Sequence, residues 1–181
     1  MSNASVPVIA IVGWKNSGKT TLVTRLIAEF VSRGVKVASV KHAHHIFEID
    51  HPGTDSYRHR QAGASAVAIV SARRVALVRE VGEGEEPGLE TVLAQLGPVD
   101  LVIVEGYKSL PLNKIEIRRR ESNRDGELAS VDPNILAIAT DYEITASVPV
   151  LDLNDPASIA DFIERAVGPL GHSTPLRADR P

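Results

Sequence analysis

The chain has no cysteine, and this absence excludes a disulfide framework, thiol catalysis and thiolate metal sites. Neither sign of charge is in large excess, since 20 Lys and Arg stand against 23 Asp and Glu and the net charge is −3. The composition therefore offers no broad basic face for nucleic acid or an anionic membrane. No apolar run approaches the roughly 20 residues of a membrane-spanning helix, and no secretory signal pattern opens the chain. We therefore expect a cytoplasmic protein with no nucleic-acid or membrane partner.

Length and hydrophobic content set the expected domain organisation. The 181 residues, of which 43% are hydrophobic, are enough for one domain with its own core and too few for two full domains. We expect a single nucleotide-binding domain over residues 6–168, with flexible termini at residues 1–5 and 169–181.

A glycine-rich segment, residues 13–20, matches every position of the G-x-x-x-x-G-K-[ST] phosphate-binding loop. It lies between an apolar run and a segment with helical periodicity, which is the strand–loop–helix context that such a loop requires. Glycine is needed where backbone N–H groups converge on phosphate oxygens, because a Cβ would obstruct that approach. The predicted nucleotide-binding residues here are Gly13, Lys15, Asn16, Ser17, Gly18, Lys19, Thr20 and Thr21.

Three side chains of this loop have predicted roles. Lys19 reaches the β- and γ-phosphates, the Thr20 hydroxyl ligates Mg²⁺, and Thr21 supports the α-phosphate. The positive end of the helix that follows points at the same anion.

The rest of the pattern predicts a three-layer α/β domain of the P-loop NTPase type, with a mostly parallel sheet and an added β-hairpin. Apolar residues between Leu22 and Val31 recur at helical spacing, which predicts a helix, and Gly34 stands where its C-terminal cap is expected. Strands are predicted at 8–12, 35–40, 99–104, 114–118, 135–139 and 148–151, a hairpin at 66–70 and 75–81, and helices at 54–62, 88–96 and 156–167, the last capped by Asp155.

The apolar run 99–104 is followed directly by a carboxylate, Glu105, and a glycine, Gly106. Ligands of open parallel sheets bind outside the carboxyl ends of the strands. Glu105 is therefore predicted to hold Mg²⁺ directly or through water, and the Gly106 amide to approach the γ-phosphate. The alternative is a carboxylate that only caps a strand end. Asp100, at the other end of this strand, is interpreted as structural.

Residues 41–56 follow the second predicted strand and contain His42, His44 and His45. Closely spaced histidines suggest zinc, but with no cysteine we favour contacts to phosphate or pterin. Asp50 and Asp55 are the best second carboxylates for the Mg²⁺ shell or an attacking water. Aspartates that stabilise surface turns explain the same residues equally well.

A further carboxylate, Asp141, follows Thr140 at the end of the strand predicted at 135–139. A carboxylate can accept hydrogen bonds from guanine N1–H and its 2-amino group, a donor pair that adenine lacks. This favours GTP, whereas an ordinary turn or helix-cap aspartate is the competing interpretation. The basic run 118–120 either reaches a phosphate or an anionic partner, or forms a solvated face.

Taken together, four segments resemble the MobB family, molybdopterin-guanine dinucleotide biosynthesis protein B. They are residues 13–21, residues 41–50, residues 52–56 with 62–64, and residues 100–108, within a resemblance that spans roughly residues 6–168. The histidine-rich segment and the Val104-Glu105-Gly106-Tyr107-Lys108 strand end are the particular features. The resemblance implies a GTP-binding protein with slow GTPase activity, dimeric through sheet elements, that assists a MobA guanylyltransferase in attaching GMP to molybdopterin. Lys15 stands one position later than the extra lysine of related dimeric ATPases, so we assign it no catalytic role across a dimer.

The predicted function is a GTP-binding adaptor, at most a slow Mg²⁺-dependent GTPase. Its catalytic candidates are Lys19, Asp50, Asp55 and Glu105, with Thr20, Glu105 and Asp55 as metal ligands. No glutamine or arginine stands out as a water-positioning residue or arginine finger, so slow turnover is expected. Two other functions remain open from the sequence: a P-loop kinase or ligase, and a metallochaperone-type GTPase.

Overall fold

The computed structural model describes residues 6–43, 47–82, 84–122 and 127–171. The chain divides into two compact units, one formed by residues 1–42 and 98–181 and the other by residues 43–97. The prediction of a single domain over residues 6–168 stays a prediction, because compact units are not the same as independently folding domains.

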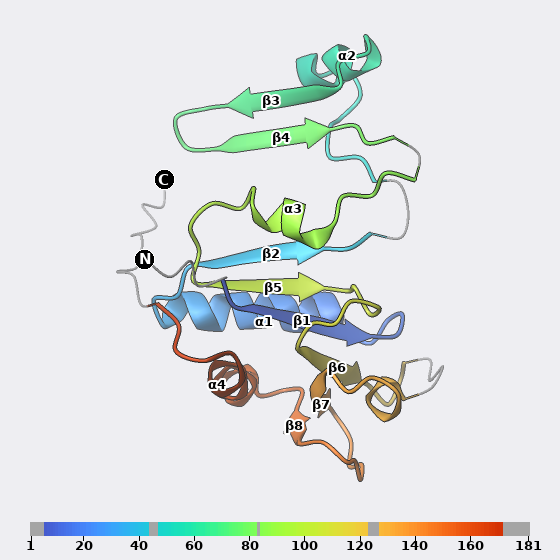
Figure 1. The fold of residues 1–181 in the computed structure, drawn as a ribbon, viewed down its shortest axis with the longest axis vertical. Helices are drawn as coiled ribbons and strands as arrows, with labels where there is room; N and C mark the ends of the chain where they lie inside the picture. The colour runs from blue at the N-terminus through green and yellow to red at the C-terminus, as the bar shows by residue number, and fades with distance from the viewer. Residues whose placement is uncertain (1–5, 44–46, 83, 123–126, 172–181) are drawn as a thin grey trace. The chain divides into compact units, whose positions relative to one another are not determined.

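The first unit is built on a six-stranded sheet in which every pair of neighbours is parallel (Figure 1). The strand order is β2-β5-β1-β6-β7-β8. The strands are β1 (Val8–Gly13), β2 (Val37–Lys41), β5 (Leu101–Glu105), β6 (Lys114–Arg118), β7 (Ile135–Thr140) and β8 (Val150–Asp152). The four leading residues of β5 are fully buried, as their continuous apolar run requires of a central strand.

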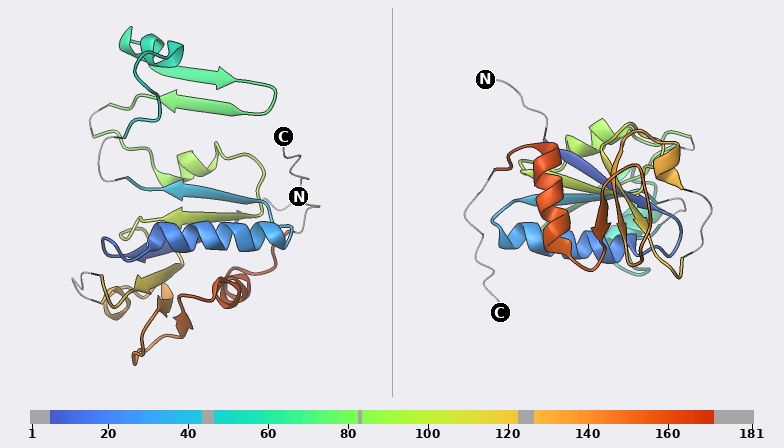
Figure 2. Two further views of the ribbon diagram at one scale, coloured as in Figure 1. Left: turned by 180° about the vertical axis from the view of Figure 1, so that it is seen from behind. Right: turned by 90° about the horizontal axis from the view of Figure 1, so that it is seen from below.

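Two helices, α1 (Lys19–Ser32) and α4 (Pro156–Val167), lie side by side and both contact β1 (Figure 2). Their apolar faces supply Leu22, Leu26, Phe30, Ile159 and Ile163 to the core. Arg33, the C-cap of α1, ties the helices together through ion pairs to Asp161 and Glu164. The predicted cap of α4 is confirmed, since the Asp155 carboxylate accepts from the Ser158 N–H at 3.0 Å. A 3₁₀ turn, η1 (Leu128–Ser130), precedes β7.

The strand order places a switch point at β1. The chain leaves β1 through α1 toward β2 and β5 on one side, and later returns to β6 on the other side. In open parallel sheets, ligands bind at the carboxyl ends of the strands beside such a point. The loop that follows β1 therefore occupies the expected ligand edge. Asp100 lies at the opposite edge, where its carboxylate accepts from the Lys36 N–H, which fits its structural interpretation.

The second unit contains α2 (Asp55–Gln61), the antiparallel pair β3 (Ala66–Val70) and β4 (Val75–Arg79), and α3 (Leu89–Leu93). The predicted hairpin is confirmed, and it forms a two-stranded sheet of its own. The α/β fold class, with a mostly parallel sheet, flanking helices and an added hairpin, is also confirmed. Among the helices described, none is both long and apolar enough to cross a membrane.

Candidate nucleotide-binding site

The phosphate loop joins β1, which ends at Gly13, to α1, which begins at Lys19. An added Cβ on Gly13 would lie 2.7 Å from Ser17 Oγ and 2.8 Å from the Ile117 carbonyl oxygen. Gly18 is the N-cap of α1 and has φ +87°, a left-handed conformation that favours glycine. Both glycines are therefore required by the local geometry, and the loop forms the kind of narrow backbone cradle that fits phosphate oxygens.

The Lys19 ammonium lies across this loop. Its Nζ donates to the carbonyl oxygens of Gly13 at 3.1 Å and Trp14 at 2.7 Å. Burial, followed by the positive charge of Lys108, lowers the pKa of Lys19, and Glu105 opposes that shift. A cation that is partly desolvated and close to other cations suits an anionic ligand, because the anion relieves their mutual repulsion.

Thr20 and Glu105 are brought together as predicted, although 85 residues separate them in sequence. The Thr20 hydroxyl donates to Glu105 Oε1 at 2.7 Å. The contact follows from the parallel pairing of β1 and β5, in which Ile11 is in register with Glu105. Lys41 Nζ lies 3.5 Å from the same carboxylate oxygen. Two adjacent oxygen donors at a phosphate loop are the chemistry that Mg²⁺ prefers.

Gly106 continues the β1–β5 ladder. Its N–H donates to the Ile11 carbonyl at 3.1 Å, so the amide is engaged within the sheet. Its φ is +100°, and an added Cβ would lie 3.2 Å from the Cβ of His42. Glycine is needed here because the chain after β2 passes closely. The predicted approach of this amide to a γ-phosphate stays a prediction.

The other predicted loop residues differ in exposure. Lys15, Asn16, Thr20 and Thr21 are exposed, and Asn16 has a left-handed φ of +63°. Ser17 is only 1% exposed, and its Oγ has no hydrogen-bond partner among the described residues. An unsatisfied buried hydroxyl beside a phosphate cradle is consistent with a role in ligand binding.

The basic run 118–120 is not a uniformly solvated face: Arg118 is largely buried, whereas the Arg119 side chain is 37% exposed. Arg118 forms a bidentate pair with the buried Glu116 and is only 12% exposed. Arg119 packs against the phosphate loop, with its Nε 3.3 Å from the position of a Cβ on Gly18. The same Nε lies 3.8 Å from Asp141 Oδ2. Arg119 therefore connects the start of α1 with Asp141.

Asp141 directly follows β7, as expected. Its Oδ1 accepts from the Arg120 N–H at 3.0 Å, which satisfies the turn interpretation while leaving further acceptor capacity. Thr140 is 4% exposed, and its hydroxyl contacts the backbone of Tyr142, so its side chain shapes the turn. A hollow of about 850 Å³ opens beside these residues, lined by residues 140–145, 150–152 and 154. That volume accommodates a nucleobase.

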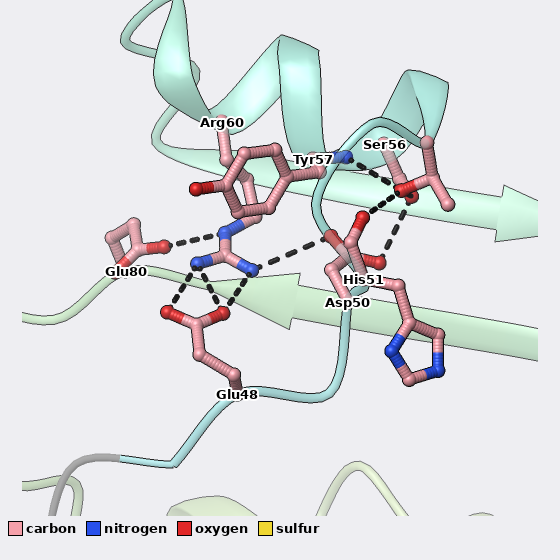
Figure 3. Close-up of polar contacts among 8 residues, drawn as sticks. Glu48, Asp50, His51, Ser56, Tyr57, Arg60 and Glu80 are labelled. Atoms are coloured by element: carbon pink, nitrogen blue, oxygen red, sulfur yellow. Dashed lines mark hydrogen bonds and ion pairs between the residues drawn. The ribbon is translucent and has the colours of Figure 1, made fainter.

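Asp50 and Asp55 belong to the second unit, where they have different surroundings; Figure 3 shows the polar contacts of Asp50. Asp50 is 8% exposed: its Oδ1 accepts from Ser56 Oγ at 2.9 Å and its Oδ2 lies 3.4 Å from Arg60. Arg60 also pairs with Glu48 and Glu80. Asp55, in the first turn of α2, is 92% exposed. These contacts fit the turn-stabilising interpretation of Asp50. That Asp50 or Asp55 takes part in metal binding or catalysis stays a prediction.

The histidine segment is only partly described. His44 and His45 lie outside the described residues, whereas the His42 ring stacks on Tyr107 with centroids 4.3 Å apart. Within the described ranges, no group of three His, Asp or Glu side chains is arranged to hold a metal ion.

Three basic or aromatic residues in or near the loop were not predicted as site residues: Trp14, Lys41 and Lys108. Lys108 Nζ lies 3.7 Å from the centroid of the Trp14 ring. The lysine was visible within the strand-end segment, but its distance from the loop in sequence gave no signal that the two are in contact.

Comparison with known proteins agrees with this geometry. The family model for molybdopterin guanine dinucleotide synthesis protein B, MobB, matches residues 8–141, well over half of the chain. Among curated relatives, molybdopterin-guanine dinucleotide biosynthesis adapter proteins are 38% identical in Haemophilus influenzae and 35% identical in Escherichia coli. The first alignment covers 90% of both chains, and the second covers 87% of this chain and 91% of the relative.

Solved structures give the same result. A crystal structure of molybdopterin-guanine biosynthesis protein B has a TM-score of 0.69 and 28% identity, covering 88% of this chain and 98% of the other. A MobB homologue from Bacillus stearothermophilus has a TM-score of 0.65 and 30% identity, with 88% and 97% coverage. The chain belongs to the MobB family of molybdopterin guanine dinucleotide synthesis proteins.

Proposed function

We propose that the chain acts in molybdopterin guanine dinucleotide biosynthesis as an adapter that is loaded with Mg²⁺-GTP. Family membership supplies the pathway and the adapter role, and it does not favour the kinase or metallochaperone alternatives. The observation that carries the nucleotide is the phosphate loop with Thr20 and Glu105 in contact at 2.7 Å. Without that pair, the loop alone would be a generic anion site.

In this proposal, the loop backbone and Lys19 hold the β- and γ-phosphates, and Thr20 and Glu105 hold Mg²⁺. The bound ion would neutralise charge on the terminal phosphates. Asp141 reads guanine, and Arg119, which contacts both Gly18 and Asp141, spans the distance between the phosphate and base ends. In this proposal the metal-binding residues lie on the β5 side of the site, and the residues that contact the base lie on the β6–β7 side.

Turnover of GTP is proposed to be slow. Among the described contacts, the charged groups that act on Glu105 are Lys19 and Lys41, and a lysine cannot take a proton from water while it is an ammonium ion. Of the two aspartates predicted as second carboxylates, Asp50 is engaged by Ser56 and Arg60, whereas Asp55 is 92% exposed, so Asp55 is the one we propose as available to a ligand. The protein would then present GTP to a partner enzyme rather than consume it rapidly.

The adapter role predicts GTP-linked association with a MobA-type guanylyltransferase. An immobilised guanylyltransferase should retain several-fold more of this chain with Mg²⁺-GTP than without nucleotide. Adding molybdopterin to the same assay tests whether it is a second ligand. Lys19→Ala, which removes the phosphate ligand, should abolish the increase. Equal retention with and without GTP would contradict a GTP-loaded adapter.

We also propose that the chain forms a homodimer through the hairpin of the second unit. A two-stranded sheet is marginally stable in water unless its apolar face is covered. One face of β3 and β4 carries Val70, Val75 and Leu77, which are 72%, 73% and 57% exposed. Pairing with a second copy would bury these side chains.

Leu77→Glu should therefore convert the dimer to a monomer, because it places a charge at the centre of this apolar face. Sedimentation velocity on the full chain measures the outcome. Arg74→Glu, a charge change in the turn of the same hairpin, is the matched control and should leave the dimer intact. A Leu77→Glu protein that remains dimeric would rule out this face.

A further inference from the structure

We propose that Lys108 is a binding residue for the terminal phosphate of the nucleotide, and that it exchanges the Trp14 ring for that phosphate when a triphosphate enters. The inference rests on the proposed nucleotide function, and it adds a residue that distinguishes triphosphate from diphosphate. Nothing in the loop pattern itself assigns this lysine a role.

Trp14 is the geometric link between the two lysines. Its carbonyl oxygen accepts from Lys19 Nζ at 2.7 Å, while Lys108 Nζ lies 3.7 Å from the centroid of its ring. The two ammonium groups therefore flank the same loop residue. Their charges interact strongly enough that Lys108 is the largest contributor, after burial, to the lowered pKa of Lys19. A second cation this close to the phosphate lysine is within reach of the same anion.

The backbone between Glu105 and Lys108 directs the lysine to this place. Gly106 and Tyr107 both have left-handed φ values, +100° and +54°. Such a conformation is uncommon for a tyrosine, and it persists only where its surroundings impose it. Here the Tyr107 ring stacks on His42, which fixes the turn after β5. Strained turns of this kind concentrate at ligand-binding sites.

Lys108 belongs to the terminal-phosphate end of the site. It follows the strand whose end supplies Glu105, and Glu105 bonds Thr20, the predicted Mg²⁺ ligand. The base end lies on the other side of β1, where Arg119 and Asp141 are 3.8 Å apart. A contact on the β5 side should therefore depend on the number of phosphates and be insensitive to the base.

The charge balance favours the same step. Lys108 and Lys41 both lower the pKa of Lys19 by their positive charge, and Lys41 Nζ lies 3.5 Å from Glu105, so an anion that enters beside Lys19 meets three cations. An aromatic face stabilises the charge of an ammonium group less than a phosphate oxygen does, because the phosphate oxygen forms a charge-assisted hydrogen bond with it. Transfer of Lys108 from the ring to the γ-phosphate is then favourable, and it changes the environment of the only tryptophan in the chain.

The test compares GTP with GDP, both with Mg²⁺, by calorimetry and by Trp14 fluorescence. Lys108→Met keeps the length of the side chain and removes its charge. We expect GTP affinity to fall about tenfold to a hundredfold, and GDP affinity to change less than about threefold. In the wild type, GTP should shift Trp14 emission in a way that GDP does not, and Lys108→Met should lose that difference. Lys36→Met, an exposed lysine at the opposite edge of the sheet, is the control and should have no effect.

Equal losses for GTP and GDP, or no loss for either, would overturn the role of Lys108. Identical Trp14 responses of the wild type to GTP and GDP would overturn it without any variant, which covers the case of a Lys108→Met protein that does not fold. Failure of the proposed function has a different signature. A wild type that binds no nucleotide refutes both proposals, whereas one that binds ATP as tightly as GTP refutes only the guanine assignment, and ATP against ADP then tests Lys108.

Discussion

Lys19→Ala is expected to weaken binding of Mg²⁺-GTP at least about a hundredfold. The substitution removes the ammonium group that bridges the carbonyls of Gly13 and Trp14. The loss has two parts. The phosphate oxygens lose a charge-assisted hydrogen bond, and the loop loses the side chain that holds its carbonyls in place.

Calorimetry with the wild type and the variant measures this effect. Lys15→Ala is the matched control, because Lys15 is an exposed lysine in the same loop for whose side chain no role is predicted. The affinity of the Lys15→Ala protein for Mg²⁺-GTP should stay within about threefold of the wild-type value. An unchanged affinity in Lys19→Ala would show that the loop does not hold the phosphates.

The second large effect is expected at the base. Asp141→Asn should lower the affinity for GTP about tenfold to a hundredfold and raise that for xanthosine triphosphate. A carboxylate accepts two hydrogen bonds from guanine, whereas the amide nitrogen is a donor that faces the guanine 2-amino group. Xanthine has an oxygen at that position, so it accepts from the amide.

The substitution is conservative for the fold. In the wild type, Asp141 Oδ1 accepts from the Arg120 N–H at 3.0 Å, and the amide oxygen of Asn can accept the same bond. A competition assay with the two nucleotides reads the preference directly. ATP binding provides the control for general damage. If the GTP-to-xanthosine-triphosphate ratio does not change, Asp141 only stabilises a turn.

Much of the geometry around the phosphate-loop motif was predictable because its signals are local or follow from parallel pairing. The loop pattern identifies Lys19 and Thr20, and a carboxylate after a buried strand identifies Glu105. Parallel strands present their carboxyl ends at one edge, which explains why a contact across 85 residues could be predicted.

The remaining contacts depend on packing between elements, which periodicity does not reveal. Nothing local in the sequence indicates that Arg119 packs on Gly18 or that Lys108 lies over Trp14. Asp50 and Asp55 looked equivalent for the same reason, since only the positions of Ser56 and Arg60 separate them. Element ends were also displaced: the strand predicted at 148–151 is Val150–Asp152, and the helix predicted at 88–96 is Leu89–Leu93. Weak amphipathic patterns leave such ends poorly defined.

The most direct test of the central claim is calorimetry of the wild-type chain with GTP and with ATP, each in the presence and absence of Mg²⁺. A Mg²⁺-GTP adapter should bind GTP at one site per chain, at least about tenfold more tightly than ATP, and more tightly with Mg²⁺ than without it. Equal affinity for GTP and ATP, or no binding of either nucleotide, would contradict it.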